Sequence, residues 1–76
     1  MRDLITYIVE NLVEEPERVR VQEVTGDKTE VLEIKVAESD QGRLIGKQGR
    51  TIRSIRSLVN ATASRTGRKA AVEVLD

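Results

Sequence analysis

Residues 42–52 read GRLIGKQGRTI, and the glycines Gly46 and Gly49 enclose two long polar residues. Glycines at this spacing weaken a helix that continues through them, so we expect the chain to turn here. Because Lys47 and Gln48 are polar, the tip of the turn should be exposed to solvent. The stretch therefore predicts two helices joined by a short exposed turn.

A short helix should precede this turn and a long helix should follow it. Ser39 or Asp40 can cap the short helix, which runs toward Ile45. The long helix begins near Arg50 and ends before Gly67, which is placed as the glycine that follows a helix. Its apolar residues recur every three to four positions, as expected for one buried stripe. They are Ile52, Ile55, Val59 and Thr62/Ala63.

Another helix is expected at the start of the chain. Its apolar residues form one stripe and are Leu4, Ile5, Ile8, Val9, Leu12 and Val13. Asp3 can cap this helix, and Pro16 forces it to end near Glu14 or Glu15.

Alternating apolar and polar residues predict three strands. Residues 18–22 and 31–36 should form an antiparallel hairpin, with Gly26 and Asp27 in a type II′ turn. Residues 70–75 read as the last strand. The second and third strands are joined through the helical pair, so they are parallel if they share a sheet.

These elements give the order α-β-β-α-α-β, which predicts an α+β fold. We expect one domain over residues 1–76, with a three-stranded mixed sheet and the helices packed on one face. Leu, Ile and Val supply 22 of the 76 residues, enough for a core. The core of so short a chain is thin, which favours dimerisation.

The composition excludes whole classes of function. The chain has no Cys, no His and one aromatic residue, Tyr7. Thiolate, zinc and imidazole chemistry are therefore absent, and the serine hydroxyls have no His to activate them. We expect no enzyme activity, no metal and no cofactor. No apolar run approaches the roughly 18 residues of a membrane span, so we expect a cytoplasmic protein.

The charges are divided along the chain although the net charge is zero. Residues 1–40 carry 5 basic and 11 acidic side chains, whereas residues 41–76 carry 8 basic and 2 acidic side chains. A segment of one sign attracts an anionic partner. The alternative is an ordinary solvated helix face.

The cations gather where a helix begins, which favours the first interpretation. Lys47, Arg50 and Arg53 oppose the helix dipole there, so they cost stability. Glycines let a phosphate backbone approach the amides at a helix N-terminus closely. The stretch does not fit a P-loop, because Gly42 and Gly46 are separated by three residues rather than four. A plain helix-helix turn remains the alternative to a phosphate clamp.

Ile45–Ile52 resembles the signature of a KH domain, whose GXXG loop clamps the backbone of about four nucleotides. The element order is similar to the type II KH arrangement. The length and the residues around the loop are similar to those of small bacterial single-KH proteins of the KhpA type. The resemblance covers essentially all 76 residues and is strongest from Asp40 to Val59.

The resemblance implies a groove between the GXXG edge and a sheet edge with a variable loop, here Ser64–Lys69. We expect single-stranded RNA to bind there by its backbone. The expected RNA-binding residues are Arg43, Ile45, Gly46, Lys47, Gln48, Gly49, Arg50, Arg53, Arg68 and Lys69. Ile45 and Ile52 could form the apolar floor of the groove, and both could equally be core.

Without aromatic stacking, binding should be weak and low in sequence specificity. This fits a non-catalytic RNA chaperone or post-transcriptional regulator. The alternatives are a protein-interaction or dimerisation module, a single-stranded DNA-binding protein, and a ribosome-assembly or translation-associated factor. The resemblance also implies a larger KH-containing RNA-binding protein as the partner in a heterodimer. The alternative assembly is a homodimer.

Overall fold

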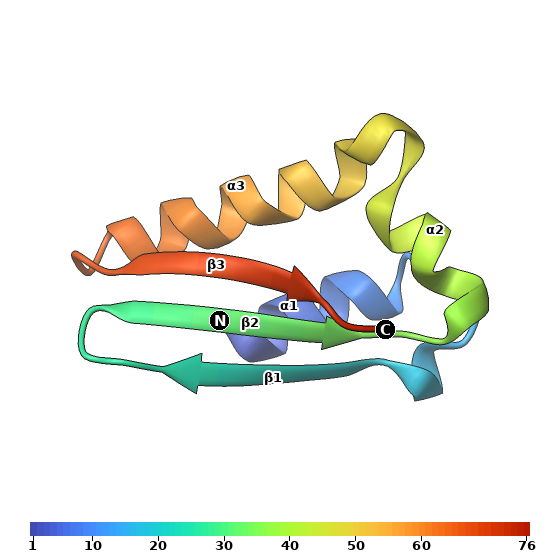
Figure 1. Ribbon diagram of the computed structural model, residues 1–76, viewed down its shortest axis with the longest axis horizontal. Coiled ribbons are helices and arrows are strands. Elements are labelled where there is room, and N and C mark those ends of the chain that lie inside the picture. Colours follow the sequence, from blue (N-terminus) through green and yellow to red (C-terminus); the bar gives the residue numbers. More distant parts are fainter.

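The computed structural model describes residues 1–76, and its three strands form one mixed sheet in the order β1-β2-β3 (Figure 1). β1 (Arg20–Thr25) pairs antiparallel with β2 (Thr29–Lys35), which pairs parallel with β3 (Lys69–Val74). The predicted hairpin and the predicted parallel pair are both confirmed.

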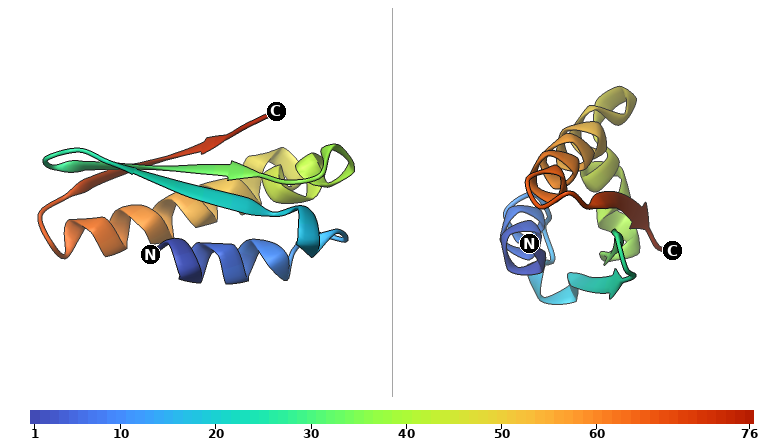
Figure 2. Two further views of the ribbon diagram at one scale, coloured as in Figure 1. Left: turned by 90° about the horizontal axis from the view of Figure 1, so that it is seen from below. Right: turned by 90° about the vertical axis from the view of Figure 1, so that its left-hand side faces the viewer.

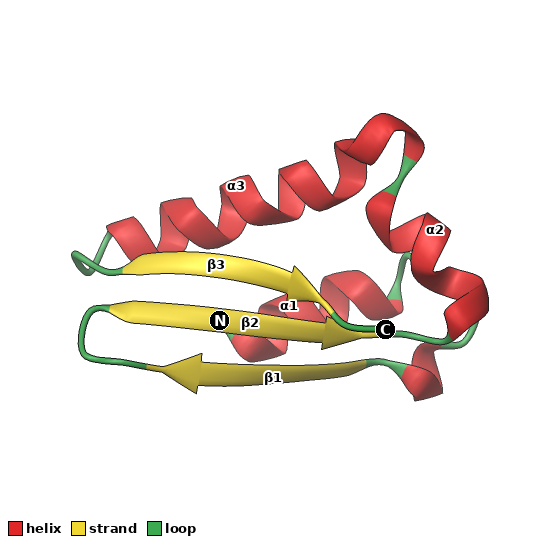
Figure 3. Cartoon of the chain, in the orientation of Figure 1, coloured by secondary structure: helices red, strands yellow, loops and turns green.

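Three α-helices accompany the sheet: α1 (Arg2–Glu10), α2 (Gln41–Ile45) and α3 (Arg50–Ser64). Short 3-10 turns lie at η1 (Pro16–Arg18), η2 (Glu38–Asp40) and η3 (Lys47–Gly49). A short loop separates α2 from the turn that leads into α3 (Figure 3). The element order and the α+β class agree with the sequence prediction. No helix is long and apolar enough to cross a membrane.

α1 and α3 lie on the same face of the sheet, and the other face carries no helix (Figure 2). Strand residues therefore alternate between a buried and an exposed side. Leu32 and Ile34 point to the helices and are fully buried, whereas Ala71 is exposed. The core cluster consists of Ile5, Val9, Val19, Leu32, Ile34, Val36, Leu44, Ile52, Ile55, Val59 and Val72. The predicted stripes of α1 and α3 supply five of these eleven residues.

The predicted hairpin turn was wrong by one residue. The Gly26 N–H donates to the Thr29 carbonyl at 2.8 Å, so Asp27 and Lys28 are the central residues of the turn. Gly26 does not adopt the positive φ that a type II′ turn requires. Pairing of Val21 with Ile34 keeps both apolar side chains on the helix side and so sets the register of the two strands.

α1 is shorter than predicted, and its predicted cap was also wrong. The helix begins after Met1 without a side-chain cap from Asp3, and it ends at Glu10. The backbone N–H groups of Glu14 and Glu15 donate to the carboxylate of Asp40, each at 3.0 Å. These bonds hold the chain beyond α1 out of a helical path. They also occupy the Asp40 side chain, which therefore does not cap α2.

Candidate functional site

The GXXG loop has a backbone that glycine alone accommodates at its first position. Gly46 has φ 78° and ψ 172°, a combination that residues with a side chain almost never adopt. A Cβ atom at Gly46 would lie 2.2 Å from the Thr51 Oγ1 atom. Gly49 has φ 74° and ψ 15°, in the left-handed region, and a Cβ there would meet no atom closer than 3.9 Å. Gly46 is required for space and backbone conformation, and Gly49 for backbone conformation alone.

The tip of the loop is exposed, as predicted. Lys47 and Gln48 are both exposed, and Gln48 itself has a positive φ of 57°. α3 begins directly after the loop with no side-chain cap and no acidic residue in its first turn. The N–H groups of that first turn therefore lack the side-chain acceptor that commonly satisfies a helix N-terminus. An anion could accept hydrogen bonds from them.

Three of the predicted cations surround this helix start and have no partner in the protein. Lys47 lies in the loop, Arg50 begins α3, and Arg53 follows one turn later. All three side chains are exposed, and none of them forms an ion pair with a carboxylate. Their positive charge is therefore available to a ligand.

The two isoleucines proposed for the groove floor have different environments. Ile45, the last residue of α2, is 37% exposed beside the loop. Ile52 is 4% exposed and belongs to the core cluster. Ile45 therefore presents apolar surface beside the loop, whereas Ile52 is a packing residue of the core.

Arg43 is held by the protein's own acidic residues. Its guanidinium pairs with the Glu14 carboxylate, and its Nε atom lies 3.4 Å from the Asp40 Oδ1 atom. Glu14 lies 29 residues earlier in the sequence, a separation that no local pattern reports, whereas Asp40 lies only three residues earlier. Arg43 is thus less available to a ligand than its sequence position suggested.

Arg68 and Lys69 lie at the opposite end of α3 from the GXXG loop (Figure 1). α3 has 15 residues, and so is about 22 Å long. The Arg68 guanidinium donates to the carbonyls of Gly26, Asp27 and Thr29 at 3.0–3.2 Å. Its Nε atom also lies 3.3 Å from the Glu30 Oε1 atom. Arg68 thus ties the α3-β3 loop to the β1-β2 turn. The structure does not bring Arg68 and Lys69 together with the cations at the GXXG loop.

Arg56 is a further cation of α3 that the sequence reasoning did not single out. Its Nη2 atom donates to the Val72 carbonyl at 3.4 Å and so bridges α3 and β3. Its spacing of three residues from Arg53 is the signal that could have placed it on a neighbouring side of the helix.

The outer edge of β3 is unpaired where Arg56 reaches it. β3 is an edge strand. The Lys69 N–H donates to the Lys28 carbonyl in the hairpin turn, and the Leu75 N–H donates to the Ile34 carbonyl of β2. Alternate residues of a strand direct their backbone groups to opposite sides. The backbone groups of Ala70, Val72 and Val74 therefore face outward, toward the space beside α3. They provide donors and acceptors that are free for hydrogen bonding except where Arg56 contacts Val72.

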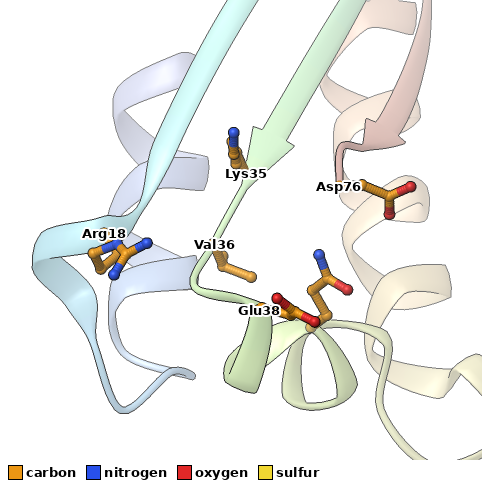
Figure 4. Close-up of a pocket in the computed structure, with 6 residues that line it drawn as sticks. Arg18, Lys35, Val36, Glu38 and Asp76 are labelled. Carbon is orange, nitrogen blue, oxygen red and sulfur yellow. The ribbon is translucent and has the colours of Figure 1, made fainter.

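A separate hollow of about 450 Å³ lies near the end of β2 (Figure 4). It is lined by Arg18, Lys35, Val36, Glu38, Gln41 and Asp76. None of the predicted site residues lines it. Its walls carry both charge signs, from Arg18 and Lys35 on one hand and Glu38 and Asp76 on the other.

Comparisons with known proteins agree with this architecture. Residues 2–74 match the family model "KhpA/KhpB, KH domain". The RNA-binding protein KhpA of Chlamydia caviae is 45% identical over 76 residues, covering the whole chain and 97% of that protein. The protein of the same name from Clostridium perfringens is 43% identical over 75 residues, covering 99% of this chain and 100% of that protein.

A solved structure shares the fold at lower identity. It is a crystal structure of Era in complex with MgGDPNP and nucleotides 1506-1542 of 16S ribosomal RNA. Its TM-score is 0.59 at 22% identity, and the match covers 97% of this chain and 30% of that one. This likeness supports the fold. The family model and the full-length relatives lead to one assignment: the chain belongs to the KhpA/KhpB family of KH-domain proteins.

Proposed function

We propose that the chain is a non-catalytic RNA-binding protein that holds single-stranded RNA by its backbone at Gly46–Gly49. One observation carries the proposal: three unpaired cations surround an exposed glycine turn at the uncapped start of α3. The KhpA relatives, which are named as RNA-binding proteins, support the choice of RNA as the ligand.

In this mechanism, phosphate groups accept hydrogen bonds from Lys47 and from backbone N–H groups at the start of α3. Gln48 bonds phosphate or sugar, and Arg50 and Arg53 extend the positive charge along the helix. The bases lie against Ile45 and toward the outer edge of β3, where Arg56 and the outward-facing backbone groups of Ala70 and Val74 can reach them. Arg43 and Lys69 act by long-range attraction, and Arg68 acts chiefly by holding its loop in place.

The same features argue for weak and general binding. No aromatic side chain lies at the loop, so each base loses a stacking contribution of about 1–3 kcal/mol. Neutralising three or four phosphates of a single strand gives a slope of log K against log salt of roughly −2 to −3. Such a module suits an RNA chaperone or a post-transcriptional regulator, and avidity through a partner would strengthen its binding.

Replacement of Lys47 and Gln48 with Asp tests the proposal. Both side chains are exposed, so the double variant should fold and should lose binding to a short single-stranded RNA. A matched control is Lys28→Asp with Gln22→Glu, which makes the same change of charge at exposed positions outside the loop. Unchanged RNA affinity in the folded loop variant would contradict the proposal. Competition with a single-stranded DNA of the same sequence distinguishes the two nucleic acids.

We also propose self-association, because apolar side chains are exposed on the helix side of the molecule. Leu4 and Tyr7 of α1 are 47% and 66% exposed, and Leu58 of α3 is 38% exposed. Both helices cover the same face of the sheet (Figure 2). Sedimentation equilibrium should show a homodimer that Leu58→Lys converts to a monomer. A wild-type monomer would point instead to a heterodimer with a larger KH-containing RNA-binding protein.

A further inference from the structure

Asp40 is the one charged residue that the fold buries, with 1% of its surface exposed. Its two carboxylate oxygens accept hydrogen bonds from the backbone N–H groups of Glu14 and Glu15. The side chain of Arg43 lies against the same carboxylate. Asp40 therefore fastens the connection between α1 and β1 to the segment that begins α2, although the two are more than twenty residues apart in the sequence.

α2 depends on such anchors for its orientation. It has five residues and is about 7.5 Å long, far shorter than a helix that is stable alone. Leu44 anchors its C-terminal part in the core, while Asp40 and the ion pair between Arg43 and Glu14 anchor it to the α1-β1 connection. The GXXG loop begins where α2 ends, and the Gly46 N–H donates to the Gly42 carbonyl at 2.8 Å. The orientation of α2 therefore sets the position of the loop.

The contact suits a carboxylate and no other short side chain. Two backbone N–H donors converge on Asp40 and need two acceptor oxygens. Asparagine offers one oxygen and would direct its NH₂ group toward the second donor. Because a buried charge is costly unless it is fully paired, a side chain needed only to fill space here would be apolar. This points to a requirement for the geometry that the carboxylate imposes.

We infer that Asp40 is a positioning residue for the GXXG loop. By tying α2 to the α1-β1 connection, it holds the loop and the start of α3 in the arrangement that receives the nucleic-acid backbone. It acts through α2 and touches no ligand. The inference rests on the proposed function for the identity of that ligand, while the positioning itself concerns the free protein.

The test compares Asp40→Asn with Glu38→Gln as a matched control. Both variants remove one negative charge from η2, and Glu38 is exposed and forms no ion pair. Affinity for a short single-stranded RNA is measured over a range of salt, at a temperature where circular dichroism shows equal folding. If the binding-competent arrangement falls to about a third of the molecules, the Kd of Asp40→Asn rises about threefold.

The salt dependence separates positioning from direct contact. Asp40→Asn removes no phosphate contact, so the slope of log K against log salt should stay at the wild-type value. Glu38→Gln should bind as the wild type does or slightly more tightly. An Asp40→Asn affinity equal to that of Glu38→Gln would overturn the inference, and so would a reduced slope. Failure of the wild type to bind RNA would instead contradict the proposed function.

A measurement on the free protein covers the case in which Asp40→Asn does not fold. Amide hydrogen exchange of the wild type should show protection at Glu14 and Glu15, which lie outside α1. Fast exchange at both amides would overturn the inference without any variant. In folded Asp40→Asn, the NMR amide shifts of residues 46–49 should change, whereas in Glu38→Gln they should not. Unchanged loop shifts in Asp40→Asn would also overturn it.

Discussion

Replacing Gly46 with Ala should destabilise the protein far more than the same change at Gly49. The backbone of Gly46 lies in a region that is essentially restricted to glycine, which costs an alanine about 1–3 kcal/mol. The new Cβ atom would also lie 2.2 Å from Oγ1, 2.7 Å from Cβ and 2.9 Å from the backbone nitrogen of Thr51. Relieving that overlap costs about 1–3 kcal/mol more, because the contact includes backbone that cannot rotate away.

At Gly49 the expected loss is smaller and has a single cause. Its left-handed conformation costs an alanine about 1–2 kcal/mol, and the space for the methyl group is open. Gly42→Ala serves as a control, since Gly42 lies in α2 without a positive φ and a Cβ there meets nothing within 4 Å. That change should stabilise the protein by about 0.5–1 kcal/mol.

The assay is thermal and urea unfolding followed by circular dichroism. In a domain of this size, each kcal/mol shifts Tm by about 4–8 °C. Gly49→Ala should therefore lower Tm by roughly 4–16 °C, Gly46→Ala should lower it by about two to three times as much, and Gly42→Ala should raise it. Equal losses at Gly46 and Gly49 would refute the reasoning, because they would show that contact with Thr51 does not constrain the loop.

Three further predictions concern the basic residues. Lys47→Ala should weaken RNA binding and reduce the slope of log K against log salt by about 0.7, measured by fluorescence anisotropy; an unchanged slope would show that Lys47 contacts no phosphate. Arg56→Ala should weaken RNA binding more than Arg65→Ala, a matched arginine at the far end of α3; equal effects would remove Arg56 from the groove. Arg68→Ala should lower the free energy of unfolding by about 2 kcal/mol, because it breaks charge-assisted bonds to the hairpin turn. A loss of RNA affinity without a loss of stability would contradict that role.

The elements were predictable because short-range patterns encode them. The spacing of Ile52, Ile55 and Val59 gives the buried side of α3, and Gly46 and Gly49 give the turn before it. Neither inference needs knowledge of another part of the chain. The same holds for the existence of the β1-β2 hairpin. The register of the two strands, however, depends on which apolar residues face each other across them, and the observed register places the turn one residue later than predicted.

The contacts of individual charged side chains were not predictable in this way. Asp40 read as a helix cap because Asp is a common cap, but its carboxylate binds backbone groups more than twenty residues earlier. Arg68 read as a free cation near the groove, but it binds a turn about forty residues earlier. Such contacts depend on how the elements pack, which local patterns do not report. For this reason the sequence identified the loop and overestimated the number of cations around it.

The sheet face without a helix offers a practical site of attachment. Ala71 is exposed on that face, and its two neighbours in the strand, Ala70 and Val72, pack on the core side. The chain contains no cysteine, so Ala71→Cys would introduce a single thiol. A fluorophore or a surface linker joined there would sit on the opposite side of the sheet from α3 and its arginines (Figure 2). The protein could then be immobilised in one orientation, with its basic side free for ligands.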